Sequence, residues 1–182
     1  DAGFGGDSSA VRDQLKGVQQ IQAALFAFAA ILQDGSVVAW GRAGSADDIS
    51  AVQDQLKGVR QIQATQKAFA AILEDGSVVT WGDANHGGDS SSVQDQLKGV
   101  QQIHATYGAF AAILADGSVV SWGPVQGGGD SSAVQDSLKG VQQIQASHDA
   151  FAAILADGSV VTWGFAEDGG DSSAVQDQLR GV

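Results

Sequence analysis

The chain of 182 residues has a formal net charge of −12 and no cysteine, and 43% of its residues are hydrophobic. The acidic surplus argues against sequence-independent binding to DNA or RNA and against binding to anionic membranes, because both depend on Lys and Arg. The absence of cysteine excludes disulfides and thiolate metal sites. No apolar run approaches about 20 residues and no signal segment is visible, so we expect a soluble chain in an unspecified compartment.

The sequence consists of a repeat 41 residues long. Tryptophan occurs at four positions only, each followed by glycine, namely Trp40, Trp81, Trp122 and Trp163. We treat 1–182 as a single repeat domain, with repeats at 1–41, 42–82, 83–123 and 124–164 and a partial repeat at 165–182. The sequence opens in mid-repeat without an initiator methionine, so it is either a processed product or, as we favour, a piece of a longer array.

The first predicted element of each repeat is a short helix of about two turns. In 48–59, Val52 and Leu56 are apolar at i and i+4, and Gly58 is a stop signal. A Ser-x-x-Gln pattern predicts a capping box at the start of this helix. The pattern occurs at Ser50 and Gln53, Ser91 and Gln94, Ser132 and Gln135, and Ser173 and Gln176.

Three strands are predicted to follow the helix. The segment 59–64 alternates imperfectly and favours an edge strand. The segments 69–73 and 77–81 flank Asp75-Gly76, which is typical of a two-residue hairpin turn with positive φ at both residues. Because both faces of this hairpin are largely apolar, we expect it to lie between layers. The fold class is therefore mainly β with short helices, in tandem repeats of a helix plus three antiparallel strands.

A phrase shared by all four repeats points to a known family. It reads AFAAIL, one variable residue, DGSVV, one variable residue and WG, followed by a glycine-rich loop. This pattern resembles the repeat of the regulator of chromosome condensation family, and its short period is most similar to the β-lactamase inhibitory propellers of that family. Near-identical arrays of this kind also resemble repeats common in dinoflagellate proteins, which would fit an algal source.

The resemblance implies antiparallel blades around a central axis. Family propellers usually have seven blades, and four repeats plus a fragment do not close such a ring. We therefore expect an open β-propeller arc, an oligomer that completes a ring, or a stacked solenoid. The sequence also departs from the family by carrying GGD where the loop usually has G-Q, as at Gly88 and Asp89.

Differences between the repeats concentrate in two segments, which we expect to form a binding surface. The first is the triplet before AFAAIL, and the second follows WG. The candidate partner-binding residues are Leu25, Phe26, Gln66, Lys67, Tyr107, His148 and Asp149 in the first segment, and Arg42, Asn85, His86 and Phe165 in the second. Aromatic residues supply much of the energy of interface hot spots. The alternative is drift in loops that nothing constrains.

These observations favour a non-catalytic protein–protein interaction module with a protein partner, and the acidic charge makes a basic or neutral partner easier to accommodate. The alternative is a structural linker or accessory subunit of a larger assembly, with an algal photosynthetic complex as one candidate. We predict no enzyme activity, cofactor or metal site. His86, His104 and His148 occupy different repeat positions, and Ser147 directly precedes His148 and Asp149, whereas a catalytic triad converges from separate segments. The four tryptophans are expected in the core, with their indole N–H groups bonded to neighbouring carbonyls.

Overall fold

The computed structural model describes residues 6–42 and 46–179 as four antiparallel sheets of three strands each. The first sheet contains β1 (Val18–Ala23), β2 (Ala27–Leu32) and β3 (Val37–Gly41); the second β4 (Val59–Ala64), β5 (Ala68–Leu73) and β6 (Val78–Gly82). The third contains β7 (Val100–Ala105), β8 (Phe110–Leu114) and β9 (Val119–Trp122); the fourth β10 (Val141–Ala146), β11 (Ala150–Leu155) and β12 (Val160–Gly164). In each sheet the strands pair in sequence order. The predicted fold class is confirmed.

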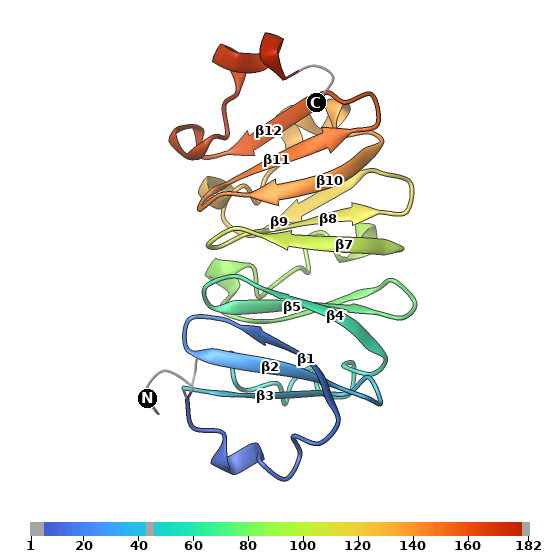
Figure 1. The fold of residues 1–182 in the computed structure, drawn as a ribbon, viewed down its shortest axis with the longest axis vertical. Helices are drawn as coiled ribbons and strands as arrows, with labels where there is room; N and C mark the ends of the chain where they lie inside the picture. Colours follow the sequence, from blue (N-terminus) through green and yellow to red (C-terminus); the bar gives the residue numbers. More distant parts are fainter. Residues whose placement is uncertain (1–5, 43–45, 180–182) are drawn as a thin grey trace.

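The four sheets form an open stack. In Figure 1 they succeed one another along the longest axis, with the first and fourth sheets at opposite ends. The repeats therefore do not close into a ring within one chain. Over the described ranges, no helix is both long enough and apolar enough to cross a membrane.

The first strand of each sheet contains a bulge, which explains its imperfect alternation. The pairing of β4 with β5 shifts between Val59 and Gln61. The extra residue places both Val59 and Ile62 on the buried side although they are three positions apart. The same shift occurs in the other three sheets.

The hairpin between the second and third strands closes differently from the prediction. Gly76 has φ +79, but Asp75 does not have positive φ. The Gly76 N–H donates to Leu73 O at 3.0 Å, and Leu73 N–H donates to Ser77 O at 2.9 Å, so the loop has three residues and only the glycine is left-handed. The Asp75 carboxylate accepts hydrogen bonds from both the N–H and the hydroxyl of Ser77, which holds the aspartate in an ordinary conformation.

The core lies between successive sheets. Ala29 and Ile31 of the first sheet pack in one cluster with Ile62, Phe69 and Trp81 of the second. Alanine side chains allow the sheets to approach closely, and full burial of a side chain as large as Phe69 contributes roughly 1.5–3 kcal/mol. Equivalent clusters join the second sheet to the third and the third to the fourth.

The predicted short helix is present as 3-10 helix in most repeats, but its capping box is wrong. These helices are η2 (Ser9–Val11), η4 (Gln94–Gln96), η6 (Ser132–Ser137) and η8 (Ser173–Gln178), whereas residues 50–55 form turns. Asp89 accepts the Ser91 N–H at 2.9 Å, while the Gln94 side chain bonds to Ser90 Oγ at 2.9 Å and to Val78 O at 3.0 Å. Because Gln94 is tied to the preceding sheet, it does not return to cap its own segment.

Candidate functional site

The variable triplets of the four repeats are joined by backbone hydrogen bonds. Leu25 N–H donates to Gln66 O at 2.9 Å, Gln66 N–H to Tyr107 O at 2.9 Å, and Tyr107 N–H to His148 O at 2.7 Å. These four residues, here named the variable ladder, occupy the middle position of each triplet. The stack therefore brings four of the sequence-predicted binding residues into one continuous line.

A hydroxyl group at the first position of the triplet fastens the loop that follows WG. Thr106 Oγ1 accepts from Ala109 N–H at 3.0 Å and donates to Gly127 O at 2.8 Å. Thr65 and Ser147 make the same two bonds in their repeats. No sequence-based prediction covered this role. A hydroxyl residue occupies this position in three of the four repeats, and that pattern could have indicated it.

The third residue of each triplet lies against the first residue after WG. Arg42 N–H donates to Phe26 O at 2.8 Å, and the Arg42 guanidinium lies 5.3 Å from the centre of the Phe26 ring. In the second repeat, Asp83 N–H donates to Lys67 O at 3.0 Å. The pKa of Asp83 lies below its ordinary value, chiefly because Asn85 N–H donates to the carboxylate, and the Lys67 charge lowers it further.

The same pairing continues in the other two repeats. Phe165 N–H donates to Asp149 O at 2.8 Å. In the third repeat Gly108 faces Pro124, and a Cβ at Gly108 would lie 3.2 Å from the proline ring. The two variable segments are thus parts of one surface. In three of the four pairs the side chains also fit each other: Arg42 and the Phe26 ring by a cation–π contact, Lys67 and Asp83 by charge, and Gly108 and Pro124 by size.

Aromatic rings stack along the upper half of the ladder. Tyr107 lies 4.6 Å from the His148 ring at an angle of 23°, and 5.8 Å from the His86 ring. Tyr107 is 41% exposed. Asn85 and His86 belong to the short turn η3 (Ala84–His86) after the second WG. This arrangement presents a broad aromatic surface to solvent.

One group near the ladder has the donor atoms of a metal site. His148, Asp149 and Asp168 place one imidazole nitrogen and two carboxylate oxygens within 4.8 Å of one another. His148 Nδ1 lies 2.7 Å from Asp149 Oδ2, which a hydrogen bond explains without a metal. Ser147 does not complete a catalytic triad with them, because its hydroxyl donates to Asp168 O.

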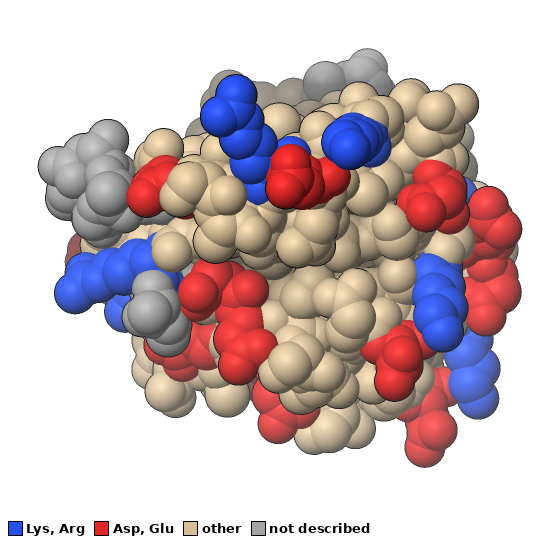
Figure 2. All heavy atoms as spheres, turned by 90° about the horizontal axis from the view of Figure 1, so that it is seen from below, with Lys and Arg blue, Asp and Glu red and all other residues tan. Residues whose placement is uncertain are grey.

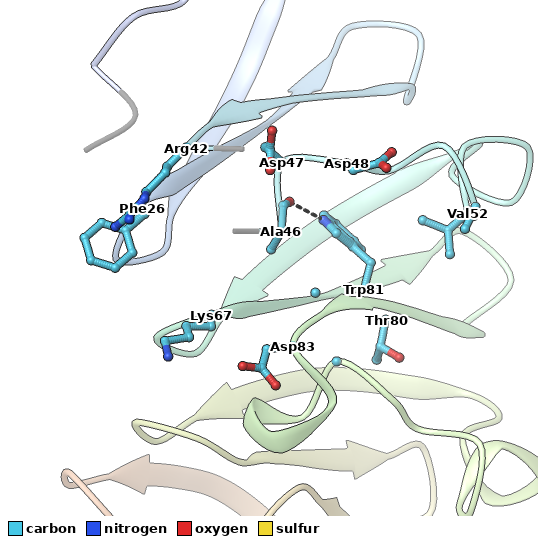
Figure 3. A pocket seen from close by; sticks show the side chains of 13 residues that line it. Phe26, Arg42, Ala46, Asp47, Asp48, Val52, Lys67, Thr80, Trp81 and Asp83 are labelled. Carbon is cyan, nitrogen blue, oxygen red and sulfur yellow. Dashed lines mark hydrogen bonds between the residues drawn. The ribbon is translucent and has the colours of Figure 1, made fainter. Parts of the chain in front are cut away.

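A pocket of about 710 Å³ opens between the first and second repeats, beside the lower half of the ladder. Figure 3 shows Phe26 and Arg42 on one side, Lys67 and Asp83 on the other, and the indole of Trp81 between them. Three residues predicted as binding residues, Phe26, Arg42 and Lys67, thus line one cavity. The pocket combines aromatic surface with charges of both signs.

The loop that follows the first sheet differs from the later loops at two residues that line the pocket. Asp47 occupies the position of Gly88, where a Cβ would lie 2.5 Å from Gly82 O. The loop path of the later repeats therefore requires glycine, and Asp47 is incompatible with it. Ala46 is also unusual, because its φ of 63° is positive and the equivalent residue of each later repeat is glycine.

The tryptophans lie beneath this surface. Trp81, Trp122 and Trp163 are at most 4% exposed, and their indole N–H groups donate to Ala46 O, Gly87 O and Gly128 O, which lie in the loops that follow the preceding sheets. Trp40 is half-buried. Each tryptophan also stacks on the phenylalanine opposite it in the neighbouring strand.

Solved structures share this fold. The chain is similar to Prp20p from Saccharomyces cerevisiae, with 17% identity and a TM-score of 0.60, over 83% of this chain and 46% of that one. It is also similar to the CRINKLY WD40 ectodomain of the Arabidopsis thaliana receptor kinase ACR4, with 20% identity and a TM-score of 0.54, over 82% of this chain and 51% of that one. Human WBSCR16 aligns with 17% identity, a TM-score of 0.52 and coverage of 81% and 47%.

These comparisons define a β-repeat fold of the regulator of chromosome condensation type, of which Prp20p, also called yeast RCC1, is an example. The chain spans about half the length of these proteins. Its sequence matches no family model, and none of the curated proteins is significantly similar to it.

Proposed function

We propose that this chain is a non-catalytic protein-interaction module whose partner lies along the variable ladder and reaches into the pocket between the first two repeats. The observation that carries the proposal is the hydrogen-bonded line of Leu25, Gln66, Tyr107 and His148. Residues that differ between otherwise near-identical repeats are gathered on one surface. Random sequence drift in unconstrained loops would not explain why residues of the two variable segments fit each other beside the ladder.

The exposed side chains on this surface are of the kind that anchors interfaces. Leu25 is 44% exposed, Tyr107 41% and Phe165 43%. Large, rigid aromatic groups gain much contact area on binding and lose little conformational entropy.

Similar folds are known to bind proteins. Prp20p has binding properties to Gsp1p and histones, and yeast RCC1 has been crystallised with Kap60. These partners belong to those proteins. For this chain the likeness in fold supports protein binding as the class of function.

The experiment compares three versions of the chain as bait in an extract of the source cells. The first is the wild type, the second carries Leu25→Ala, Tyr107→Ala and Phe165→Ala, and the third carries Val175→Ala. Val175 is 44% exposed, as much as the three substituted residues, but belongs to η8, outside the two variable segments. We expect one protein to be retained by the wild type and the Val175 variant and lost from the triple variant, with unchanged melting temperature.

Equal retention by all three baits would contradict the proposal. It would favour the alternative of a structural linker or accessory subunit that contacts its assembly through other surfaces. A lower melting temperature of the triple variant would be resolved by testing the three single substitutions separately.

A further inference from the structure

The lower end of the stack exposes apolar side chains that are buried wherever two repeats meet. Ile21 on β1 is 54% exposed, whereas the equivalent isoleucines of the later repeats, Ile62, Ile103 and Ile144, are at most 1% exposed. Phe28 and Trp40, beside it, are only half-buried. We name these three residues, Ile21, Phe28 and Trp40, the β1 face. Figure 2 views this end and shows charged side chains around an uncharged area.

The upper end of the stack has the complementary surface. Ala152 and Ile154 on β11 are half-buried, whereas Ala70 and Ile72 at the same positions of the second repeat are 0% exposed. Gly169, in the loop that follows, is exposed. We name Ala152, Ile154 and Gly169 the β11 face.

Contacts inside the chain show how these two faces fit. A Cβ built on Gly87 would lie 2.7 Å from Phe110 Cδ2 of the next sheet, and one on Gly128 would lie 2.7 Å from Phe151 Cδ2. These glycines therefore receive the phenylalanine ring of the sheet that follows them. A Cβ on Gly169 meets nothing within 4 Å. Gly169 at the upper end therefore has room for a phenylalanine ring. Phe28 at the lower end of another copy is the equivalent of Phe110 and Phe151.

Both faces have the residue types of the contacts between sheets. The capping repeats of stacked proteins carry polar residues on their outer surface. Ile21, Phe28 and Trp40 are instead the same residue types as at the interior positions of the later repeats. The same holds for Ala152 and Ile154.

We propose that copies of this chain associate head to tail, with the β1 face of one copy packed on the β11 face of another through the contact that joins its own repeats. The occupant of each face is thus a second copy. Because the two surfaces differ, the contact propagates into linear chains or closes into a ring.

The association includes an exchange of one segment. Residues 171–182 repeat the sequence of 7–18 with only two substitutions, so both segments compete for one place at the joint. The C-terminal segment is anchored, because Gln176 Nε2 donates to Val160 O at 3.1 Å and Ser172 bonds to Thr162 at 3.0 Å. Arg12 occupies the position of that glutamine. Segment 171–179 of one copy therefore stays in place at the joint, and segment 7–17 of the other copy is displaced from it. The displaced segment has nearly the same sequence as the one that replaces it.

The test is the mass of the full chain in solution, measured by sedimentation over a range of protein and salt concentrations. We expect species at multiples of 18.5 kDa that increase with protein concentration. Salt should strengthen the association, because each copy carries a net charge of −12 and salt screens their repulsion.

Two variants each block one face. Ile21→Glu places a carboxylate on the β1 face, and Ala152→Glu places one on the β11 face. Each variant alone should remain at 18.5 kDa, and an equal mixture should form only a dimer of twice this mass, since one free face of each kind remains. Val125→Glu, on a side loop where Val125 is 63% exposed, is the matched control and should associate like the wild type.

A wild type that stays monomeric under all conditions would overturn the proposal. So would a mixture of the two blocked variants that stays monomeric, or a control that loses association as strongly as Ile21→Glu. If Ala152→Glu lowers the melting temperature, Ile154→Lys blocks the same face and takes its place.

Discussion

Trp122 Nε1 donates a hydrogen bond of 3.0 Å to the carbonyl oxygen of Gly87, 35 residues earlier in the sequence. The bond joins the third sheet to the loop that follows the second sheet. Trp81 and Trp163 make the equivalent bonds to Ala46 O and Gly128 O. The tryptophan of each later sheet is therefore bonded to the end of the variable segment that follows the preceding sheet.

Trp122→Phe should lower the free energy of unfolding by about 2 kcal/mol. The substitution leaves Gly87 O without its donor and creates a cavity beside Phe110. Trp40→Phe is the control, and because Trp40 is half-buried it should cost less than about 1 kcal/mol. Urea unfolding of both variants measures the difference, and equal losses would contradict the assigned role.

Gly87→Ala should destabilise the chain more than Gly169→Ala. Both glycines have positive φ, so alanine is strained by roughly 1 kcal/mol at either site. At Gly87 the new Cβ also meets the Phe110 ring, which adds about 1–3 kcal/mol, while at Gly169 it meets nothing within 4 Å. Thermal melting separates the two, and an identical loss would show that the ring contact is unimportant.

A buried hydrogen-bond network of the third sheet is replaced by apolar residues at the equivalent positions of the first sheet and its following loop. Ser121 Oγ donates to Ser131 Oγ at 2.9 Å, and Ser131 Oγ bonds to Gln135. The equivalent residues of the first repeat are Ala39 and Ile49. Ser131→Ile alone should cost about 2 kcal/mol because Ser121 loses its buried partner.

Adding Ser121→Ala to Ser131→Ile should restore about 1 kcal/mol of this loss, since the apolar pair of the first repeat is then reproduced. Chemical unfolding of both single variants and the double variant gives the coupling energy. A coupling energy near zero would mean that the two hydroxyls do not act as a pair.

The hairpins and the tandem sheets could be predicted from the sequence because their signals are local. Asp-Gly turns, alternating apolar residues and the spacing of Trp all lie within one repeat. The predicted two-residue turn was wrong, and the reason is also local. Ser77 donates hydrogen bonds to the Asp75 carboxylate, and Asp75 does not adopt positive φ. The variable ladder was not predictable, because its hydrogen bonds join residues one repeat apart and depend on how the sheets stack.

Residues 50–55 form turns instead of the predicted short helix for a similar reason. The pattern of Val52, Leu56 and Gly58 fits a helix when it is considered alone. Leu56 is drawn into the core between two sheets and Gln53 bonds to Val37 O of the preceding sheet. Tertiary contacts therefore outweigh local helix propensity in this segment. Ala46 and Asp47 likewise line the pocket, and the sequence alone does not show that the equivalent glycines of the later loops have no room for a side chain.

The free energy of unfolding should fall at acidic pH because of the aspartates in the four hairpin turns. The pKa of Asp116 lies below its ordinary value because the Ser118 hydroxyl, and then the Ser118 N–H, donate to the carboxylate. A depressed pKa in the folded state stabilises the fold above the unfolded pKa of about 4, and this contribution is lost as pH falls through the folded pKa. Asp34, Asp75 and Asp157 are held in the same way.

Ser118→Ala should raise the pKa of Asp116 toward its ordinary value and leave that of Asp75 unchanged. Carboxyl NMR titration of the two residues in one sample provides the measurement with its internal control. An unshifted Asp116 would show that the serine hydroxyl is not the main cause.

Disulfide formation between neighbouring ladder positions tests the central claim most directly, because the chain has no cysteine of its own. Residues joined by backbone hydrogen bonds across the ladder lie about 5 Å apart, within the range of a disulfide. Tyr107→Cys with His148→Cys should therefore form an intramolecular disulfide under mild oxidation, whereas Leu25→Cys with His148→Cys, three steps apart, should not. Failure of the first pair, or ready closure of the second, would contradict an open stack that aligns its variable residues in one line.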